Sequence, residues 1–305
     1  MRVSIEVPAP VVDTALVRRL IAAQFPRWAR LPLTRLKPGG SDHVIHRLGS
    51  ELSVRLPRGD WAVGQAEAEH FWLPRIAPLL PVAVPEPLAL GTPALGYPWP
   101  WAVTRWIEGE TASVEGLADP RRTARELAGF LTALQGLPHA DELAPGPHPG
   151  LGGSPLSARD HATRRAIAAL DGVFDARALT EVWDSALAAP AWDRPPVWFH
   201  GDFHTGNLLL TADGRLSSVI DFGGLGMGDP AVDLTVAWTL LTPAARRDFR
   251  AALGVDDATW ERGRAWALTG GLGAYLSYAA TSPAVAAQTH RQITEVLTDH
   301  TDRTG

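Results

Sequence analysis

Residues 197–224 read VWFHGDFHTGNLLLTADGRLSSVIDFGG, and this segment is the most informative part of the chain. Its runs at 208–210 (Leu-Leu-Leu) and 217–220 (Ser-Ser-Val-Ile) are strand-like. Between them, 213–214 is an Asp-Gly pair, a strong signal for a tight hairpin turn. The stretch therefore predicts a small antiparallel hairpin with polar residues before its first strand and after its second.

Three oxygen-bearing side chains flank the predicted hairpin. Asn207 comes directly before the first strand, Asp221 directly after the second, and Asp202 five residues before Asn207. The hairpin thus brings one amide and two carboxylates to the same end. An amide and a carboxylate oxygen make an incomplete magnesium shell, which leaves positions for phosphate oxygens and water. A separate carboxylate can accept the proton of an attacking hydroxyl. The set predicts phosphoryl transfer, with Asp202 as the base and Asn207 and Asp221 as Mg²⁺ ligands.

These residues resemble the catalytic and metal-binding loops of the aminoglycoside phosphotransferase family, which has a protein-kinase-like fold. The match comprises the His-Gly-Asp triplet 200–202 with Asn207, the Ile-Asp-Phe-Gly segment 220–223, and Gly-Asp-Pro-Ala-Val-Asp-Leu at 228–234. Protein kinases carry an arginine at the position of Gly201. Because that arginine answers a phosphorylated activation loop, the glycine implies a small-molecule kinase that is constitutively active.

The resemblance also implies a nucleotide site in the N-terminal third of the chain. The segment Gly-Gly-Ser-Asp at 39–42 is similar to the loop that covers the nucleotide phosphates, where glycines let backbone N–H groups approach an anion. Glu69 resembles the helix glutamate that pairs with a strand lysine in the family. The segment 105–107 resembles the hinge whose backbone would hold adenine.

One position departs from the family pattern. The strand-like run that should carry the phosphate-contacting lysine has Arg55 instead, and the only lysine of the chain, Lys37, precedes the glycine loop. Arginine keeps a fixed positive charge and can clamp a carboxylate bidentately, so Arg55 is expected to replace the lysine and to pair with Glu69. The nucleotide contacts expected from the resemblance are Gly40, Ser41, Arg55, Glu69, Arg105 and Ile107.

Composition excludes several other classes of protein. Of the 305 residues, 46% are apolar and 20% charged, which is typical of a globular protein. A net charge of -5 argues against a nucleic-acid partner. The absence of cysteine excludes disulfides, thiolate zinc sites and cysteine nucleophiles. The most apolar late segment, 265–280, is shorter than the roughly 20 residues of a membrane-spanning helix. It predicts a buried helix, and with no signal peptide recognised we expect a cytoplasmic protein without a membrane partner.

The pattern of strands and helices predicts two lobes, a nucleotide-binding lobe over 1–107 and a catalytic, acceptor-binding lobe over 108–305. The first is expected to hold one helix, and the second mainly helices. The expected strands of the first lobe are 43–48, 51–56, 88–90 and 101–107, around a helix at 61–76. The expected helices of the second are 120–137, 158–170, 176–188 and several from about 229 to 299. The fold class is therefore α+β: a bilobed protein-kinase-like fold with a small antiparallel-sheet N-terminal lobe and a larger helical C-terminal lobe.

Other residues of the chain have simpler expected roles. His200 is expected to be buried and bonded to backbone, and His204 to be a loop residue near phosphate or solvent. Asp233 is expected to brace the catalytic loop and to cap the helix that follows. Several acidic and tyrosine residues of the second lobe could line an acceptor pocket, although acids on helices are usually solvated: Asp256, Asp257, Glu261, Tyr275 and Tyr278.

The favoured interpretation is a magnesium-assisted O-phosphotransferase that uses ATP, with GTP as the alternative donor. The resemblance implies a small cationic acceptor of the aminoglycoside type. Alternative acceptors are a macrolide, a peptide antibiotic, an amino alcohol or another hydroxylated metabolite. Two other classes stay open: a metal-dependent hydrolase that uses His200, Asp202 and His204 as zinc ligands, and a nucleotide-binding module without catalytic activity.

Overall fold

The structure is a computed structural model that describes residues 11–37, 39–138 and 154–304. The chain divides into two compact units, which are described separately below. The first consists of residues up to 78 together with 84–108, and the second of 79–83 together with 109–305. Helices and an antiparallel sheet occur together, which confirms the predicted α+β class.

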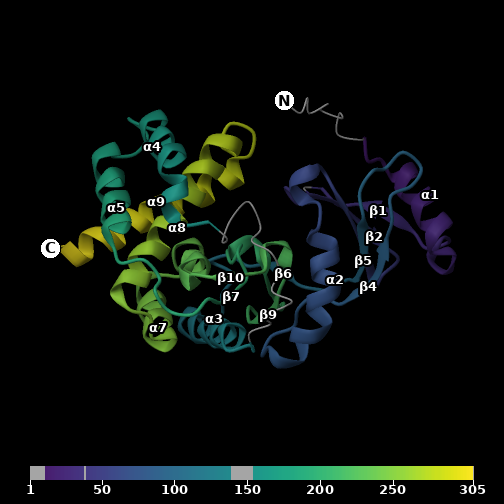
Figure 1. Ribbon diagram of the computed structural model, residues 1–305, viewed down its shortest axis with the longest axis horizontal. Helices are drawn as coiled ribbons and strands as arrows, with labels where there is room; N and C mark the ends of the chain where they lie inside the picture. Colours follow the sequence, from purple (N-terminus) through teal and green to yellow (C-terminus); the bar gives the residue numbers. More distant parts are fainter. Residues whose placement is uncertain (1–10, 38, 139–153, 305) are drawn as a thin grey trace. The chain divides into compact units, whose positions relative to one another are not determined.

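An antiparallel five-stranded sheet forms the centre of the first unit (Figure 1). The strands follow one another in the spatial order β1 (Leu33–Arg35), β2 (His43–Leu48), β3 (Leu52–Pro57), β5 (Trp101–Arg105) and β4 (Pro87–Gly91). The predicted hairpin is confirmed, because β2 and β3 pair from His43 opposite Pro57 to Leu48 opposite Leu52. Gly49 in its turn has a φ of 62°, in the left-handed region that glycine adopts without strain.

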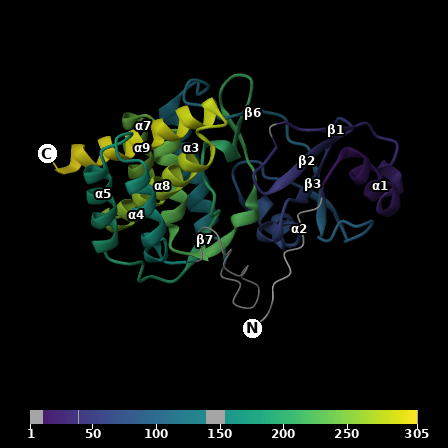
Figure 2. The ribbon, with the colours of Figure 1, turned by 90° about the horizontal axis from the view of Figure 1, so that it is seen from above.

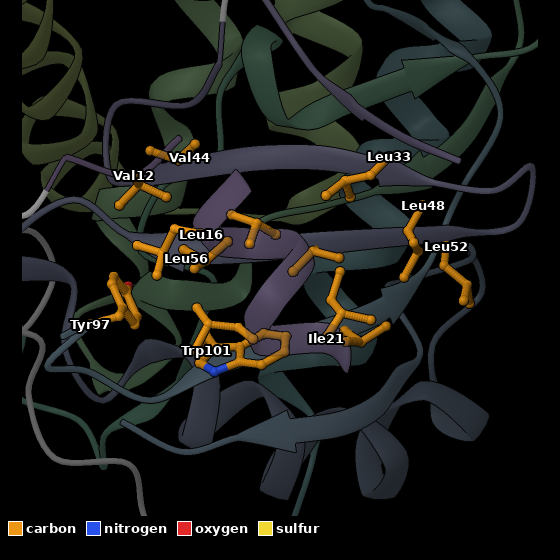
Figure 3. Packing of buried hydrophobic residues seen from close by; sticks show 14 of the residues in the cluster. Val12, Leu16, Ile21, Leu33, Val44, Leu48, Leu52, Leu56, Tyr97 and Trp101 are labelled. Carbon is orange, nitrogen blue, oxygen red and sulfur yellow. The ribbon is translucent and has the colours of Figure 1, made fainter. Parts of the chain in front are cut away.

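One face of this sheet packs against a helix that the sequence analysis missed. This helix, α1 (Thr14–Gln24), begins at Asp13, whose side chain accepts a hydrogen bond from the N–H of Leu16. Its buried residues recur at helical spacing and join strand residues in the core drawn in Figure 3: Leu16, Val17, Leu20 and Ile21. The prediction of a single helix in this lobe was therefore wrong, although the capping aspartate and the apolar spacing both indicate α1.

The helix predicted at 61–76 is present but shorter. It is α2 (Gln65–Ile76), and it is preceded by a short 3₁₀ turn, Asp60–Ala62. Gly64 has a φ of 91° and separates the two, so the helix cannot begin earlier. The buried Glu69 lies on α2 and contacts Arg55 of β3.

Short strands in the second unit carry the catalytic segment. The predicted hairpin is confirmed as β8 (Leu208–Leu210) paired with β9 (Leu216–Val219), and β6 (Glu110–Thr111) adds a third strand beside β8. A separate two-stranded sheet joins β7 (Val197–Phe199) to β10 (Gly226–Gly228). The residues between β7 and β8 form the loop 200–207, which we call the catalytic loop.

Helices make up most of the second unit. They are α3 (Pro120–Gln135), α4 (Asp160–Ala169), α5 (Ala176–Ala188), α6 (Val236–Thr239), α7 (Pro243–Leu253), α8 (Asp257–Tyr278) and α9 (Pro283–Thr304). Helices α4, α5, α8 and α9 lie side by side (Figure 2). The helices predicted at 120–137, 158–170 and 176–188 are confirmed, with ends shifted by up to two residues.

The prediction of a buried helix over 265–280 is only partly right. The first part of this segment is buried in α8, whereas Leu276 and Tyr278 near its end are each 47% exposed. Within the described residues, no helix combines the length and the apolar character that crossing a membrane requires.

Candidate active site

The catalytic loop is held at its start by a buried carboxylate. Asp233 accepts the backbone N–H of His200 at 2.6 Å and that of Gly201 at 2.8 Å. Burial raises the pKa of Asp233 to about 7, against the effect of these two N–H groups, and the negative charge of Asp202 raises it further. Asp233 therefore braces the loop as predicted. The predicted capping role was wrong: Asp233 lies inside the 3₁₀ segment Pro230–Thr235, which Asp229 caps through the N–H of Ala231, and the next helix begins after Thr235 without a side-chain cap.

His200 connects the catalytic loop to the end of β9. Its Nδ1 accepts the N–H of Asp202 at 3.3 Å, so its hydrogen is on Nε2, which donates to the carbonyl of Ile220 at 3.1 Å. Burial lowers the pKa of His200 to about 4, despite the nearby carboxylates. The imidazole is neutral near pH 7 and serves to hold the backbone, which is the role the sequence predicts.

Asp202 lies at the centre of the loop with part of its carboxylate accessible to solvent. Asn207 Nδ2 donates both to the carbonyl of Asp202 and to its Oδ2, at 2.9 Å each. The Nε2 of His204 lies 3.5 Å from Oδ1. Burial by itself raises the pKa of Asp202, but His204, His200 and the Asn207 amide outweigh it, so the pKa is below its ordinary value. The carboxylate is therefore ionised near pH 7, as a general base must be.

His204 has a more specific place than the loop position predicted for it. Its Nδ1 accepts the N–H of Gly206 at 3.0 Å, which places the hydrogen on Nε2, toward Asp202. Burial lowers the pKa of His204, but the carboxylates of Asp202 and Asp221 outweigh this effect and the pKa is raised. A Cβ on Gly206 would lie 2.7 Å from the Cε1 of His204. Glycine is therefore required where the ring packs against the loop.

The hairpin brings the two predicted magnesium ligands together at one end. The N–H of Ile220, at the end of β9, donates to the carbonyl of Asn207 at 2.9 Å. Asp221 follows directly, with φ 65° and ψ 68°, in the left-handed region. Non-glycine residues in this region cost about 1–3 kcal/mol and cluster at functional sites. The backbone strain at Asp221 therefore supports a functional role for its side chain.

Gly201 is required by the approach of two backbone segments. Its φ is 85°, and a Cβ there would lie 2.2 Å from the carbonyl oxygen of Gly224. No side chain fits in that space. The arginine of protein kinases is therefore absent for a geometric reason, because the catalytic loop packs directly on the segment that follows Asp221.

Aromatic rings pack beneath the catalytic loop and the segment that follows β9. The ring of Phe222 lies 4.6 Å from that of His200, centroid to centroid. Phe130 of α3 stacks on Phe203 at 5.5 Å and contacts the edge of Phe222 at 6.5 Å. All three phenylalanines are buried. This packing fixes the catalytic loop and the segment after β9 on one rigid support.

In the first unit, the structure pairs Arg55 with Glu69. The Nη1 of Arg55 donates to Glu69 Oε1 at 2.9 Å and to Oε2 at 2.7 Å. The two side chains are only 11% and 3% exposed. A cation from β3 and an anion from α2 are thus joined on the sheet face opposite α1.

The glycine loop contains a contact that the sequence did not indicate. Arg58 donates from Nε to the carbonyls of Gly40, at 3.0 Å, and His43, at 3.2 Å. Ser41 is exposed, and its hydroxyl contacts only the neighbouring Asp42 among the described residues, at 3.3 Å. Arg58 therefore holds the shape of the loop, while the hydroxyl of Ser41 stays accessible.

The structure distinguishes the residues of the predicted hinge. The N–H of Arg105 donates to the carbonyl of Glu86 at 2.8 Å, and its side chain pairs with Glu86 at 2.5 Å. The N–H of Trp106 donates to the carbonyl of Glu51. Within the described part of the chain, no hydrogen bond engages the backbone of Ile107. Of the predicted hinge residues, Ile107 is the one whose backbone N–H and carbonyl both lack a hydrogen bond to the described residues.

Comparison with known protein families identifies the family of this chain. The model of the phosphotransferase enzyme family, APH, matches residues 32–266. The chain belongs to this family. The predicted phosphotransferase class is thereby confirmed, and the match extends from β1 through the catalytic loop into α8. No curated protein sequence matches the chain significantly.

Solved structures with similar folds include enzymes that act on two classes of antibiotic. APH(2″)-IIIa, in its GDP and kanamycin complex, is 19% identical, with a TM-score of 0.72 over 93% of this chain and 99% of that one. APH(2″)-IIa, in its complex with streptomycin and ATP, is 16% identical, with a TM-score of 0.60 over 88% and 92%. The macrolide 2′-phosphotransferase MphH from Brachybacterium faecium is 21% identical, with a TM-score of 0.58 over 92% and 97%. These likenesses confirm the predicted fold.

The acids considered for an acceptor pocket of this family member are all neutralised by arginine. Asp256 pairs with Arg194, Asp257 with Arg250 and Glu261 with Arg264. Tyr275 and Tyr278 lie at the other end of α8, and 18 residues of helix separate Tyr275 from Asp257, about 27 Å. The interpretation of these five residues as one pocket lining was therefore wrong, because a straight helix cannot bring its two ends together.

The zinc hydrolase alternative finds no support in the geometry of the imidazoles. Each ring of His200 and His204 accepts a backbone N–H through Nδ1, and each Nε2 faces an oxygen of the chain itself. The described residues hold no group of three His, Asp or Glu side chains arranged around one metal position. A magnesium ion bound partly by phosphates and water needs fewer protein ligands than zinc does.

Proposed function

We propose that this chain transfers the γ-phosphoryl group of ATP or GTP to a hydroxyl group of a small antibiotic. The observation that carries the proposal is the ionised, partly exposed carboxylate of Asp202, held by Asn207 next to the strained Asp221. An aminoglycoside is the first acceptor to test, because the similar enzymes bind kanamycin or streptomycin.

A macrolide is the second candidate acceptor, because a macrolide phosphotransferase is also among the similar structures. The acids considered at the start of α8 do not line one pocket with the tyrosines at its end, so their pairing with arginines does not distinguish the two classes of antibiotic.

The second unit would supply the base and the metal ligands. Asp202 would accept the proton of the acceptor hydroxyl as the hydroxyl oxygen attacks the γ-phosphorus. The bond from the γ-phosphorus to the bridging oxygen breaks in the same step, and ADP or GDP leaves. Asn207 uses its amide nitrogen on Asp202, so its Oδ1 would serve as a metal ligand, and Asp221 would add a carboxylate oxygen. This oxygen set fits Mg²⁺. When bound, Mg²⁺ neutralises charge that develops on the phosphates.

The first unit would hold the nucleotide. Arg55, oriented by Glu69, would place a fixed positive charge near the phosphates. The segment at Gly40 and Ser41, kept in shape by Arg58, would cover them with backbone N–H groups. The backbone of Ile107 would bind the base. The side chain of Arg105 is already paired with Glu86, so only the backbone of the hinge is assigned to the nucleotide.

Acceptor-dependent release of ADP or GDP tests the proposal. The purified chain is incubated with magnesium, either nucleotide and a panel of aminoglycosides, macrolides, peptide antibiotics and amino alcohols. We expect release with at least one acceptor and a loss of about 1,000-fold in Asp202→Asn, which keeps the shape of the side chain but cannot accept the proton.

Nucleotide binding is measured in parallel, as the shift in melting temperature with magnesium and ATP or GTP. Asp202→Asn is expected to keep the wild-type shift, since Asp202 contacts the acceptor. Binding without turnover on any acceptor would instead indicate the module without catalytic activity. A chain that binds neither nucleotide would contradict the proposal.

A further inference from the structure

The segment 229–241 anchors the catalytic loop at two points. Asp233 holds the start of the loop through two backbone N–H groups. Six residues later, Thr239 Oγ1 accepts the N–H of Thr205 at 3.3 Å. Both threonines are buried, and Thr205 lies between Asp202 and Asn207 in the sequence. The spacing of the proposed base and the proposed metal ligand therefore depends on where Thr239 is held.

Two arginines hold the C-terminal end of this segment. Helix α6 is only four residues long, so its last carbonyl groups lack partners within the helix. Arg246 of α7 donates from Nε to the carbonyl of Ala237 at 3.0 Å. Arg291 of α9 donates to three further carbonyls, at 3.4, 2.9 and 3.2 Å, those of Trp238, Thr239 and Leu241. The residue that holds Thr205 is thus itself held by α9.

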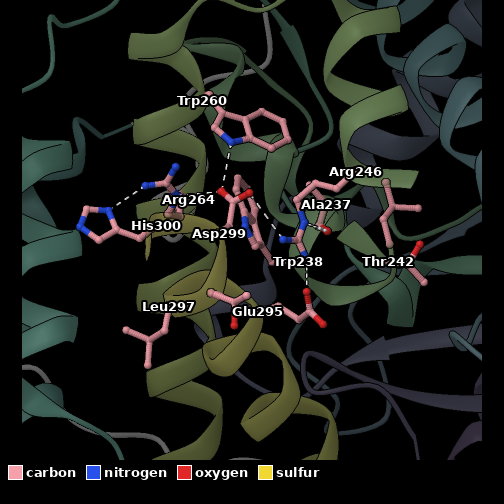
Figure 4. A network of polar contacts seen from close by, with 12 residues as sticks. Ala237, Trp238, Thr242, Arg246, Trp260, Arg264, Glu295, Leu297, Asp299 and His300 are labelled. Atoms are coloured by element: carbon pink, nitrogen blue, oxygen red, sulfur yellow. Dashed lines mark hydrogen bonds and ion pairs between the residues drawn. The ribbon is translucent and has the colours of Figure 1, made fainter. Parts of the chain in front are cut away.

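Acidic residues of α9 fix the guanidinium groups in turn. Arg246 pairs with Glu295 and, at 3.5 Å, with Asp299 (Figure 4). Asp299 also accepts the Nε of Arg264 at 3.0 Å. The side chains of Arg246 and Arg264 are 3% and 0% exposed, respectively. Since removing one partner of a buried ion pair leaves an uncompensated charge, this end of the segment has one well-defined arrangement.

We propose that Arg291 is a positioning residue for phosphoryl transfer, which acts through Thr239 on the N–H of Thr205. The inference rests on the proposed function, because it assigns the C-terminal helix a part in the geometry of that same site. A displacement of reacting groups by 1 Å can cost about 100-fold in rate. Losing one of the two loop anchors is therefore expected to lower kcat, while the nucleotide contacts of the first unit keep their place.

Matched substitutions at Thr239 and Arg291 test the proposal. Thr239→Val keeps the shape and removes the acceptor, whereas Thr239→Ser keeps the hydroxyl. Arg291→Met removes the donors, whereas Arg291→Lys keeps a positive charge. We expect kcat to fall about tenfold in Thr239→Val and Arg291→Met, with the nucleotide KM unchanged and activity restored in Thr239→Ser. Thr294→Val, on the exposed side of α9, is the control and should keep wild-type kcat.

Two further measurements separate positioning from stability and from the proposed function. If both residues act on Thr205, the double variant Thr239→Val with Arg291→Met loses no more kcat than one single variant. Amide hydrogen exchange at 200–207 should be faster in both single variants at a temperature where they are fully folded. Unchanged exchange, or a kcat that falls only with the folded fraction, would overturn the positioning role. A wild-type chain without turnover on any acceptor would refute the proposed function. The exchange result would still decide whether Arg291 and Thr239 hold the catalytic loop in place.

Discussion

The two units hold their proposed functional residues in opposite ways. In the first unit, one buried ion pair, Arg55 with Glu69, fixes the charge assigned to the nucleotide phosphates. In the second unit, the backbone of the catalytic loop is held by Asp233, by Thr239 and by the N–H of Ile220, which donates to the carbonyl of Asn207. The first arrangement depends on two particular side chains. The second depends on the space around a backbone, and on carboxylate and hydroxyl groups placed far away in the sequence.

This difference determines which substitutions each unit tolerates. Removing one partner of a buried ion pair leaves the other charge unpaired in an apolar environment. A loop held through backbone N–H groups accepts side-chain changes where there is room, but not an added Cβ where two backbones meet. A change of charge should therefore damage the first unit most, and a change of volume the second.

Among the substitutions that test this contrast, the largest effect is expected from a methyl group on the catalytic loop. In Gly201→Ala, the new Cβ would have to occupy a position 2.2 Å from the carbonyl of Gly224, at a φ of 85°. The loop must move away, so we expect kcat to fall by about 100-fold or more. Magnesium nucleotide should still shift the melting temperature as in the wild type.

Gly254→Ala is the matched control for Gly201→Ala. Gly254 also has a positive φ, 67°, but nothing lies within 4 Å of a Cβ built there. Gly254→Ala should show the loss of stability that a strained backbone causes by itself, without the loss of kcat. Equal activity in Gly201→Ala and the wild type would show that the loop and the Gly224 segment are not packed as described.

A smaller but still large effect is expected when the ion pair of the first unit is broken. Arg55→Met leaves Glu69 buried without its charge partner, and the free energy of unfolding should fall by about 3–5 kcal/mol. Nucleotide KM should rise, whereas kcat should change less. The measurements are urea denaturation and the dependence of rate on nucleotide concentration.

Arg55→Lys separates charge from geometry in the same pair. Lysine keeps the charge but offers no planar fork to the carboxylate. If the charge alone matters, Arg55→Lys binds nucleotide as tightly as the wild type. If the bidentate contact with Glu69 sets the position of the charge, nucleotide KM rises in Arg55→Lys as well. Wild-type nucleotide binding in Arg55→Met would remove Arg55 from the nucleotide site.

The same contrast explains what could be predicted from the sequence. The hairpin, with Asn207 and Asp221 at its end, depends on a local turn signal and on strand-like runs, so it could be located from nearby residues alone. The Arg55 and Glu69 pair could be expected only through resemblance to a family, because fourteen residues separate the two. The opposite charges of two side chains indicate such a contact.

What the sequence did not reveal depends on the approach of distant backbones. The reason for Gly201 is a carbonyl 23 residues away, and the role of Arg291 is to bind carbonyl groups about 50 residues away. Backbone carbonyls are present at every residue and carry no signal in the sequence. Helix α1 is different, because its cap at Asp13 and its apolar spacing are both local features that indicate a helix in the sequence.

The smallest effect we expect concerns the buried His46 of β2, a residue with no assigned role in the proposed function. Burial, aided by the charge of Arg35, lowers the pKa of His46 from 6.5 to about 4. The unfolded chain therefore binds a proton between these values that the folded chain does not. The stabilisation is complete above pH 6.5 and is lost as the pH falls toward 4, by about 3 kcal/mol at most. His46→Leu should remove this part of the pH dependence, and urea denaturation of both proteins from pH 4 to 8 measures the difference. A constant difference across that range would show that His46 titrates alike in the folded and unfolded chains, and that the contact with Thr14 leaves the ring accessible to water.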